Sequence, residues 1–509
     1  MVAAGTADSG AATKPRRRFA RSPVAFVSVV LALGAFLETR LWVVAKFPYF
    51  VDEGILAYFA QLGRNPDQRL VSLEEGVRPG LVWLTLVGMR LHLDPLWSIR
   101  LAALSFGLLG AVCGTLLAAR HVGKVGAVAF AVLVLATPYL FVYEPLGLRD
   151  PVIAGLMLAG LLLEIELARN PRPLIGALLG VTFALDLLVK ESGEVALYLL
   201  PLSLLYFPFR SPERVRLART WVGSAALALL VAYLGSLPMK LSSNYGRLAS
   251  IQRNMGVIRT FSGVSRHPLR YFDQSWPEVR GDLTSYLTYP ILALVLVGLV
   301  LGLRYRTRFT ALVAIWAIVQ IGSVILLAGQ KNLDARYLVP AIGFVLLIGA
   351  IGVEELAGRA GRFLGNGRRA GAVGIAAGLA LLVPALIFDG RVSYDTASAP
   401  FPPGDKLQFV TGSPSGYGAQ GAIDELAVLA NGQHLDLLAN PALDNETYEL
   451  LGIIRGLDIN WIWTDDPAAK TAALFTNGTP LPTGVGSFRQ IWSYQRPDGG
   501  TPLAIYIHR

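Results

Sequence analysis

Long apolar runs alternate with short polar segments along most of the chain. Runs of roughly 18 or more apolar residues with few charges are long enough to cross about 30 Å of hydrocarbon. The pattern predicts about eleven membrane-spanning helices, so we expect a polytopic α-helical membrane protein. The expected spans lie near 24–46, 97–119, 122–143, 151–168, 172–189, 193–208, 219–237, 283–303, 308–328, 337–355 and 371–389.

Short basic clusters separate some of these runs, and all of them fall on one side of the predicted bundle. They lie at 119–124, 168–174, 209–219, 304–308 and 358–371, on the same side as the basic N-terminal segment 1–23. Cytoplasmic loops carry an excess of Lys and Arg. We therefore expect a multi-pass protein of the cell membrane with a cytoplasmic N-terminus.

Composition supports this interpretation and excludes several others. The chain is 53% hydrophobic and only 16% charged, where soluble domains carry about 25% charged residues. The net charge of +10 follows from the basic clusters, which suit membrane topology and lipid headgroups rather than nucleic acid. The single cysteine, Cys113, makes no intramolecular disulfide, and the five histidines show no zinc-ligand spacing.

The composition divides the chain into three parts. Residues 1–23 have a disordered, basic composition, 24–389 hold the spans, and 390–509 form a polar tail outside the cytoplasm. In the tail the pattern predicts a small α/β domain. Its expected elements are a strand at 406–412, a helix at 422–431, a strand at 435–440, a helix at 446–456, a strand at 459–465 and a hairpin around 496–502.

Two external loops interrupt the membrane domain. They cover 47–96 and 238–282. Within the first, the apolar stretch 78–93 is too short to span a bilayer and suits a helix lying in the interface.

Charged residues gather at the outer ends of several spans, beginning with Asp52 and Glu53 directly after the first one. Each has an ordinary explanation: Asp52 as a helix cap, Asp150 as the cap before Pro151, and Asp186 with Lys190 as a pair on one helix face. Together, however, they place acids and cations on one external rim, where charge is costly and commonly functional. The other rim residues are Arg78, Glu144, Arg149, Glu191, Lys331, Asp334, Arg336 and Tyr337.

A rim of this kind suits one type of reaction. Cations bind an anionic phosphate, and arginine matches its oxygens with two hydrogen bonds. A nearby carboxylate can accept the proton of an incoming hydroxyl. The combination favours attack by an acceptor on a sugar carried by a lipid phosphate, with the cations stabilising the departing phosphate.

The chain resembles the GT-C glycosyltransferases that use polyprenyl-phosphate sugars, a group that includes protein O-mannosyltransferases and the aminoarabinose transferase of lipid A. The resemblance covers roughly 24–390. It rests on the order of several segments: VDEG at 51–54, GVRPGLVWL at 76–84, LWSIRLAAL at 96–104, PLGLRDPVIAGL at 145–156, LDLLVKESG at 185–193 and ARYLVPA at 335–341.

The resemblance implies a role for each matched residue. Asp52 would be the base, Glu53 its support and Asp150 a second acid. The donor phosphate and sugar would be held by Arg78, Arg149, Lys190, Lys331, Arg336 and Tyr337. Glu191 departs from the family pattern, since its charge would oppose a phosphate beside Lys190.

The resemblance also implies the partners. We expect a polyprenyl-phosphate sugar donor, membrane lipid and an envelope acceptor with a hydroxyl or amine, and no nucleic acid. No cofactor is required; the acids could hold a divalent metal, but nothing in the sequence demands one.

Two other functions compete with this hypothesis. A transporter or flippase for lipid-linked sugars would need charged groups near the bilayer midplane and broken helices. A non-catalytic envelope scaffold would use the external domain as its working part. The clustering of ionisable groups at one rim favours the glycosyltransferase.

Overall fold

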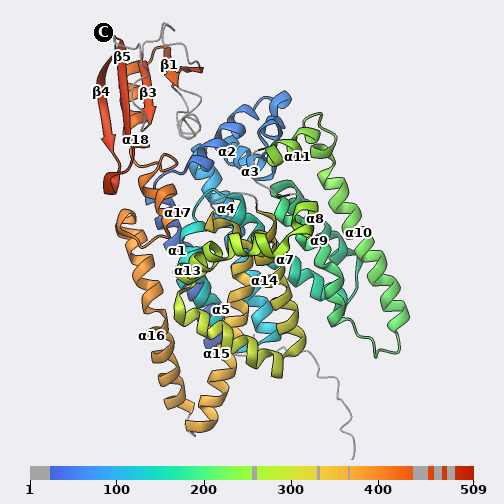
Figure 1. Cartoon of the computed structure of the whole chain (residues 1–509). Helices are drawn as coiled ribbons and strands as arrows, with labels where there is room; N and C mark the ends of the chain where they lie inside the picture. Colours follow the sequence, from blue (N-terminus) through green and yellow to red (C-terminus); the bar gives the residue numbers. More distant parts are fainter. Residues whose placement is uncertain are drawn as a thin grey trace, which may run out of the picture.

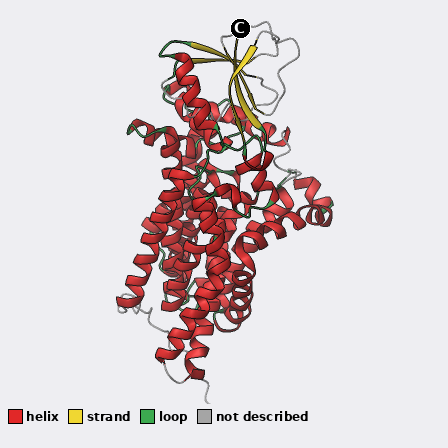
Figure 2. Cartoon of the chain, turned by 90° about the vertical axis from the view of Figure 1, so that its left-hand side faces the viewer, coloured by secondary structure: helices red, strands yellow, loops and turns green. Residues whose placement is uncertain are grey.

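The computed structural model describes residues 23–254, 259, 261–328, 333–364, 367–439, 457–463, 473–477 and 488–508. It shows a bundle of helices with a small β-sheet beyond one end (Figure 1). Seen from the side, most helices run along one common direction and the strands lie at a single end of the bundle (Figure 2). The polar tail therefore projects from the membrane domain.

Seven segments in the described part of the chain are long and apolar enough to cross a membrane, which makes this a multi-pass membrane protein. They are α1 (Pro23–Lys46), α4 (Pro95–His121), α7 (Arg149–Arg169), α10 (Arg214–Lys240), α13 (Pro268–Tyr305), α14 (Thr307–Leu327) and Ala335–Phe363, which contains η5 (Ala335–Leu338) and most of α15 (Val339–Leu364). Three shorter apolar helices accompany them: α3 (Gly80–Arg90), α5 (Lys124–Ala136) and α8 (Pro173–Val189). The expected count of eleven spans is not confirmed.

The run 193–208 differs most from its predicted form. It folds into η3 (Glu191–Gly193), the six-residue helix α9 (Glu194–Leu199) and the seven-residue 3₁₀ segment η4 (Leu200–Tyr206), which has a proline near its start. A 3₁₀ segment rises about 2.0 Å per residue, so α9 and η4 together extend about 23 Å. The chain still returns toward the opposite end of the bundle, because Tyr206 packs against His121 at the end of α4.

Two further expected spans are also irregular. The run 122–143 breaks at Thr137 into α5 and the short helix α6 (Pro138–Tyr143). The long helix α13 kinks at Thr288, where φ is +57°. Helix α16 (Gly367–Tyr394) covers the last expected span.

Close helix contacts are built on glycine. A Cβ at Gly155 of α7 would lie 2.0 Å from the Phe106 carbonyl oxygen of α4, and one at Gly298 of α13 would lie 1.9 Å from the Ile348 carbonyl oxygen of α15. Small residues allow membrane helices to approach in this way. These contacts hold α7 against α4 and α15 against α13, and the starts of α7 and α15 carry several of the predicted site residues.

The external loops form short helices. The first contains α2 (Val51–Leu62), η1 (Pro66–Gln68), η2 (Val71–Glu75) and α3, so a helix is present within 78–93 as predicted. The second contains α11 (Tyr245–Asn254), α12 (Phe261–Arg266) and the first part of α13.

The tail confirms most predicted elements but not the first. Residues 406–412 are helical rather than extended, because α17 (Pro403–Lys406) continues into the π-helical η7 (Leu407–Thr411). The sequence pattern predicted a strand because Phe409 and Val410 are apolar, but both side chains are buried on a helical turn. The predicted helix at 446–456 lies outside the described residues.

The sheet contains five strands in the order β2-β1-β3-β5-β4. Strand β1 (Leu435–Ala439) pairs in parallel with β2 (Ile459–Trp463) and with β3 (Ala473–Asn477), which the sequence did not predict. Strands β4 (Phe488–Gln495) and β5 (Pro502–His508) form the expected hairpin. Helix α18 (Ala419–Ala430) packs on β4 and β5.

Candidate functional site

The exit from α1 is held by Glu53. Its two carboxylate oxygens accept hydrogen bonds from Arg100 of α4, both at 2.7 Å. The backbone N–H groups of Phe50 and Gly147 donate to the same carboxylate at 3.1 and 2.7 Å. Glu53 therefore fixes the start of α2 and the segment that leads into α7. The sequence suggested Asp52 as the cap of this helix, but Glu53 makes the contact instead.

Asp52 contacts a different segment from Glu53. Its carboxylate forms an ion pair with Arg336 of η5, 284 positions away along the chain. Asp52 keeps 31% of its side-chain surface exposed, whereas Arg336 keeps 12%. Arg336 also pairs with Asp334 at 2.9 Å and lies 5.6 Å from the centre of the Phe50 ring. A carboxylate that is reachable from outside thus lies beside a well-held guanidinium.

A second acid–cation pair joins α7 to the end of α8. The Lys190 amine lies 2.5 Å from the Asp150 carboxylate, and both side chains are largely buried. The same amine lies 4.5 Å from the centre of the Tyr337 ring. Burial lowers the pKa of Lys190, and the charges of Arg149 and Arg336 lower it as well, although Asp150 opposes them. The three cations are therefore close enough to interact.

Arg149, unlike Lys190 and Arg336, is not paired with an acid in the described part of the chain. Its buried Nη1 also has no hydrogen-bond partner there. A buried donor without a partner costs about 1–3 kcal/mol. A ligand that accepts a hydrogen bond would satisfy this group.

Arg78 is engaged elsewhere. Its guanidinium lies 2.8 Å from Glu191 and 2.7 Å from Glu194, and it donates to the Leu187 carbonyl oxygen at 2.7 Å. The negative charge of Glu191 would oppose a phosphate beside Lys190. Because this charge is paired with Arg78, Glu191 is compatible with a phosphate there.

The 403–416 segment, which leads from α16 to the sheet, covers the α1 exit. The Phe409 ring packs edge-on against Phe50 with ring centres 5.1 Å apart. Gln408 donates a hydrogen bond to Asp334, the second partner of Arg336. This contact was not predicted, because the segment was expected to be a strand of the external domain.

Asp405 fastens this segment to the bundle. Its buried carboxylate accepts hydrogen bonds from the hydroxyls of Tyr143 in α6 and Tyr286 in α13. Burial raises the pKa of Asp405 to about 6, while the two tyrosine hydrogen bonds act in the opposite direction. The charges of Asp334 and Arg336 act on it too, with opposite signs.

Other ionisable groups lie inside the bundle, away from the Asp52 and Asp150 pairs. Arg40 pairs with Glu144 at 3.2 Å, so this rim acid serves α1 rather than the site. Glu164 and Asp186 are buried, and their carboxylate oxygens have no partner among the residues that the structure describes. The expected pair of Asp186 with Lys190 is wrong, because the lysine reaches Asp150 instead.

Lys331, a predicted phosphate ligand, lies outside the described residues. Within the described ranges, no group of three or more His, Cys, Asp or Glu side chains is arranged to hold a metal ion. Asp52 and Asp150 each have a cationic partner already. A pair of acids neutralised in this way does not suit a divalent cation, and we derive no step through one.

The chain is similar to solved structures of two kinds. ArnT from Cupriavidus metallidurans in the apo state is 17% identical, with 88% of this chain and 87% of that chain covered and a TM-score of 0.52. The same protein bound to undecaprenyl phosphate is 15% identical, with 95% and 98% covered and a TM-score of 0.53.

The oligosaccharyltransferase of Archaeoglobus fulgidus, tethered to an acceptor peptide containing the NVT sequon, is 14% identical, with 88% of this chain and 65% of that chain covered and a TM-score of 0.55. No protein-family model and no curated protein matches the chain. Both neighbours have the GT-C fold. The expected GT-C fold is confirmed.

Proposed function

We propose that this protein is an integral membrane glycosyltransferase. It moves a sugar from a polyprenyl-phosphate donor to a hydroxyl or amine of an envelope acceptor. One observation carries the proposal: two acids and three cations from four distant segments meet at one end of the bundle. These residues are Asp52, Asp150, Arg149, Lys190 and Arg336.

The charges suit the reaction step by step. The acceptor oxygen or nitrogen attacks the anomeric carbon, the bond from that carbon to the phosphate oxygen breaks, and polyprenyl phosphate leaves. Asp52 takes the acceptor proton, since it is the exposed acid of the two. General base catalysis of this kind contributes about 10²–10⁴-fold.

The cations stabilise the leaving phosphate. The unpartnered Nη1 of Arg149 donates to a phosphate oxygen, and Lys190 and Arg336 add charge beside it. Fixed donors aimed at developing charge are worth far more in a site that excludes water. Undecaprenyl phosphate bound to the similar ArnT structure supports this type of donor.

The remaining predicted residues act around this centre. Glu53 positions Asp52 and Arg149 through its contacts to both segments, and Tyr337 places its ring beside Lys190. Arg78 keeps Glu191 away from the phosphate. With a cytoplasmic N-terminus, the reaction takes place on the extracytoplasmic face, beside the sheet domain.

The experiment is a transfer assay with purified protein and a panel of labelled polyprenyl-phosphate sugars. We expect one donor to be consumed, and Asp52→Asn to reduce that transfer at least about 100-fold. Stability should fall by no more than about 1 kcal/mol, because the pair with Arg336 is partly exposed. Asp67→Asn, which changes an exposed acid in the same external loop, is the matched control. Full activity in Asp52→Asn would remove this residue from the mechanism.

One observation favours the transporter alternative. Glu164 and Asp186 are buried acids in α7 and α8 whose oxygens have no partner in the described ranges, and intramembrane acids often mark a substrate or proton path. Proteoliposomes that translocate a fluorescent lipid-linked sugar without transferring it, and lose this activity with Glu164→Gln, would establish the transporter instead.

A further inference from the structure

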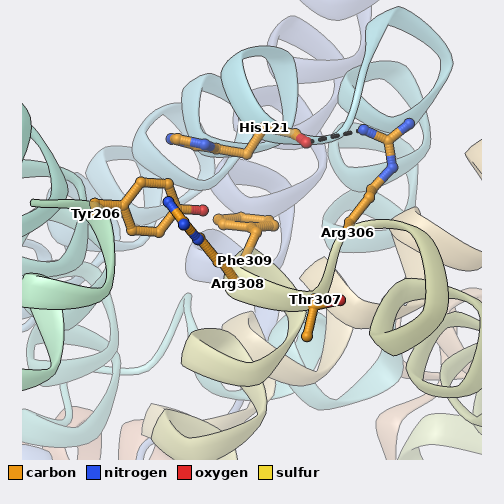
Figure 3. Close-up of a pocket in the computed structure, with 6 residues that line it drawn as sticks. All are labelled: His121, Tyr206, Arg306, Thr307, Arg308 and Phe309. Carbon is orange, nitrogen blue, oxygen red and sulfur yellow. Dashed lines mark hydrogen bonds between the residues drawn. The ribbon is translucent and has the colours of Figure 1, made fainter. Parts of the chain in front are cut away.

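A cavity lies at the end of the bundle opposite the Asp52 site. His121 follows Arg100 by 21 residues on α4, which places it about 32 Å further along the helix. The cavity has a volume of about 410 Å³ and is open to the outside (Figure 3). Its lining residues are His121, Tyr206, Arg306, Thr307, Arg308 and Phe309.

Packed aromatic rings form one wall of this cavity. The His121 ring stacks on Phe309 with ring centres 4.8 Å apart and meets Tyr206 edge-on at 5.1 Å. Arg306 donates to the His121 carbonyl oxygen at 3.0 Å (Figure 3). It also pairs with Glu355 at 2.9 Å. The wall is therefore built by contacts between four elements: α4, η4, α14 and α15.

The cavity carries excess positive charge. Arg169 and Arg308 lie close enough to act electrostatically on the Tyr206 phenol, and in the described part of the chain neither has a carboxylate within ion-pair distance. The 21-residue helix α14 also begins here, at Thr307. The carbonyl ends of α4 and α13 lie at the same place, so the helix ends offset one another and the excess charge comes from the arginines.

Apolar surface continues away from this charge. Leu205 and Phe209, on either side of Tyr206 and close to it in sequence, are 40% and 60% exposed, and Leu116 of α4 is 38% exposed. Exposed apolar side chains of a membrane protein can contact acyl chains. The excess of cytoplasmic arginines explains the charge alone, but not an aromatic cavity beside it.

We infer that this cavity binds the phosphate of an anionic phospholipid in the leaflet at the basic end of the bundle. Arg308 and Arg169 hold the phosphate, Tyr206 and Phe309 line the headgroup, and the acyl chains lie along the exposed leucines. Basic pockets between membrane helices are suited to such headgroups. This site is independent of the proposed sugar transfer.

The test is native mass spectrometry of the full-length protein in detergent, titrated with dioleoyl phosphatidylglycerol or phosphatidylcholine. We expect tighter retention of phosphatidylglycerol and about fivefold weaker retention in Arg308→Gln. Arg308→Lys should restore retention, because a phosphate is also bound by a point charge. The matched control is Arg216→Gln, an exposed arginine at the start of α10 outside the cavity.

Two results would overturn the inference. Equal weakening by Arg216→Gln would show that overall surface charge is responsible. Displacement of the lipid by a few millimolar inorganic phosphate would show that the cavity is a site for a soluble anion. Unchanged thermal unfolding of each variant in lipid-free detergent excludes misfolding as the cause of lost retention.

Discussion

Replacing Arg149 with glutamine separates a ligand-binding role from a structural one. The arginine begins α7, and its buried Nη1 has no partner in the described ranges. A structural arginine would lose native hydrogen bonds on substitution, whereas Arg149 has none of these at Nη1 to lose. Donor affinity and protein stability should therefore respond differently.

The magnitudes follow from this geometry. A hydrogen bond to a charged group contributes about 1.5–3 kcal/mol, so the affinity for polyprenyl phosphate should fall about 10- to 150-fold. The free energy of unfolding should stay unchanged or rise, because the unsatisfied buried donor, which costs about 1–3 kcal/mol, is removed.

The assay pairs two measurements on the same sample. Isothermal titration with a short-chain polyprenyl phosphate gives the affinity, and thermal unfolding in detergent without donor gives the stability. Arg40→Gln is the matched control, because Arg40 is a buried arginine that is fully bonded to Glu144 and to the carbonyl oxygens of Val134 and Leu135. It should show the reverse result, with about 3–5 kcal/mol of stability lost and donor affinity kept in the folded protein.

Equal affinity of Arg149→Gln and the wild type for polyprenyl phosphate would exclude Arg149 as a phosphate ligand. A large loss of stability would also contradict this role, since that would assign the arginine to the scaffold.

Three more predictions concern Glu53, Asp405 and the membrane topology. Glu53→Gln should destabilise the protein by about 3–5 kcal/mol, because it leaves the buried charge of Arg100 without its partner; an unchanged unfolding temperature would contradict this. Asp405 has a raised pKa, so its contribution to docking of the 403–416 segment is complete below pH about 4 and is lost as the pH rises through about 6. Hydrogen exchange at residues 403–411, corrected for intrinsic rates, should be faster at pH 7.5 than at pH 5, and Asp405→Asn should abolish the difference; an equal pH response in both proteins would exclude Asp405. Reporter fusions at Arg210 and Gln408 should lie on opposite sides of the membrane, and a shared side would break the proposed topology.

The sequence by itself determined the class of protein and the position of its charges along the chain. Length and hydropathy decide whether a helix can cross hydrocarbon, and both are local properties that need no partner. For the same reason the rim positions could be predicted, because each residue lies close to one end of an apolar run. These residues are Asp52, Asp150, Lys190 and Arg336. The order of these segments along the chain provided the resemblance to the GT-C glycosyltransferases.

Only the tertiary structure decided which charge meets which. Neighbouring acids such as Asp52 and Glu53 cannot be told apart by pattern, but one is buried against Arg100 and the other faces Arg336. The sequence also did not predict that the 403–416 segment covers the α1 exit. This arrangement depends on hydrogen bonds from two tyrosines, each more than 100 positions away, to Asp405. Ion pairs and buried hydrogen bonds are selected by the geometry of the whole fold, and a linear pattern contains no distances between remote segments.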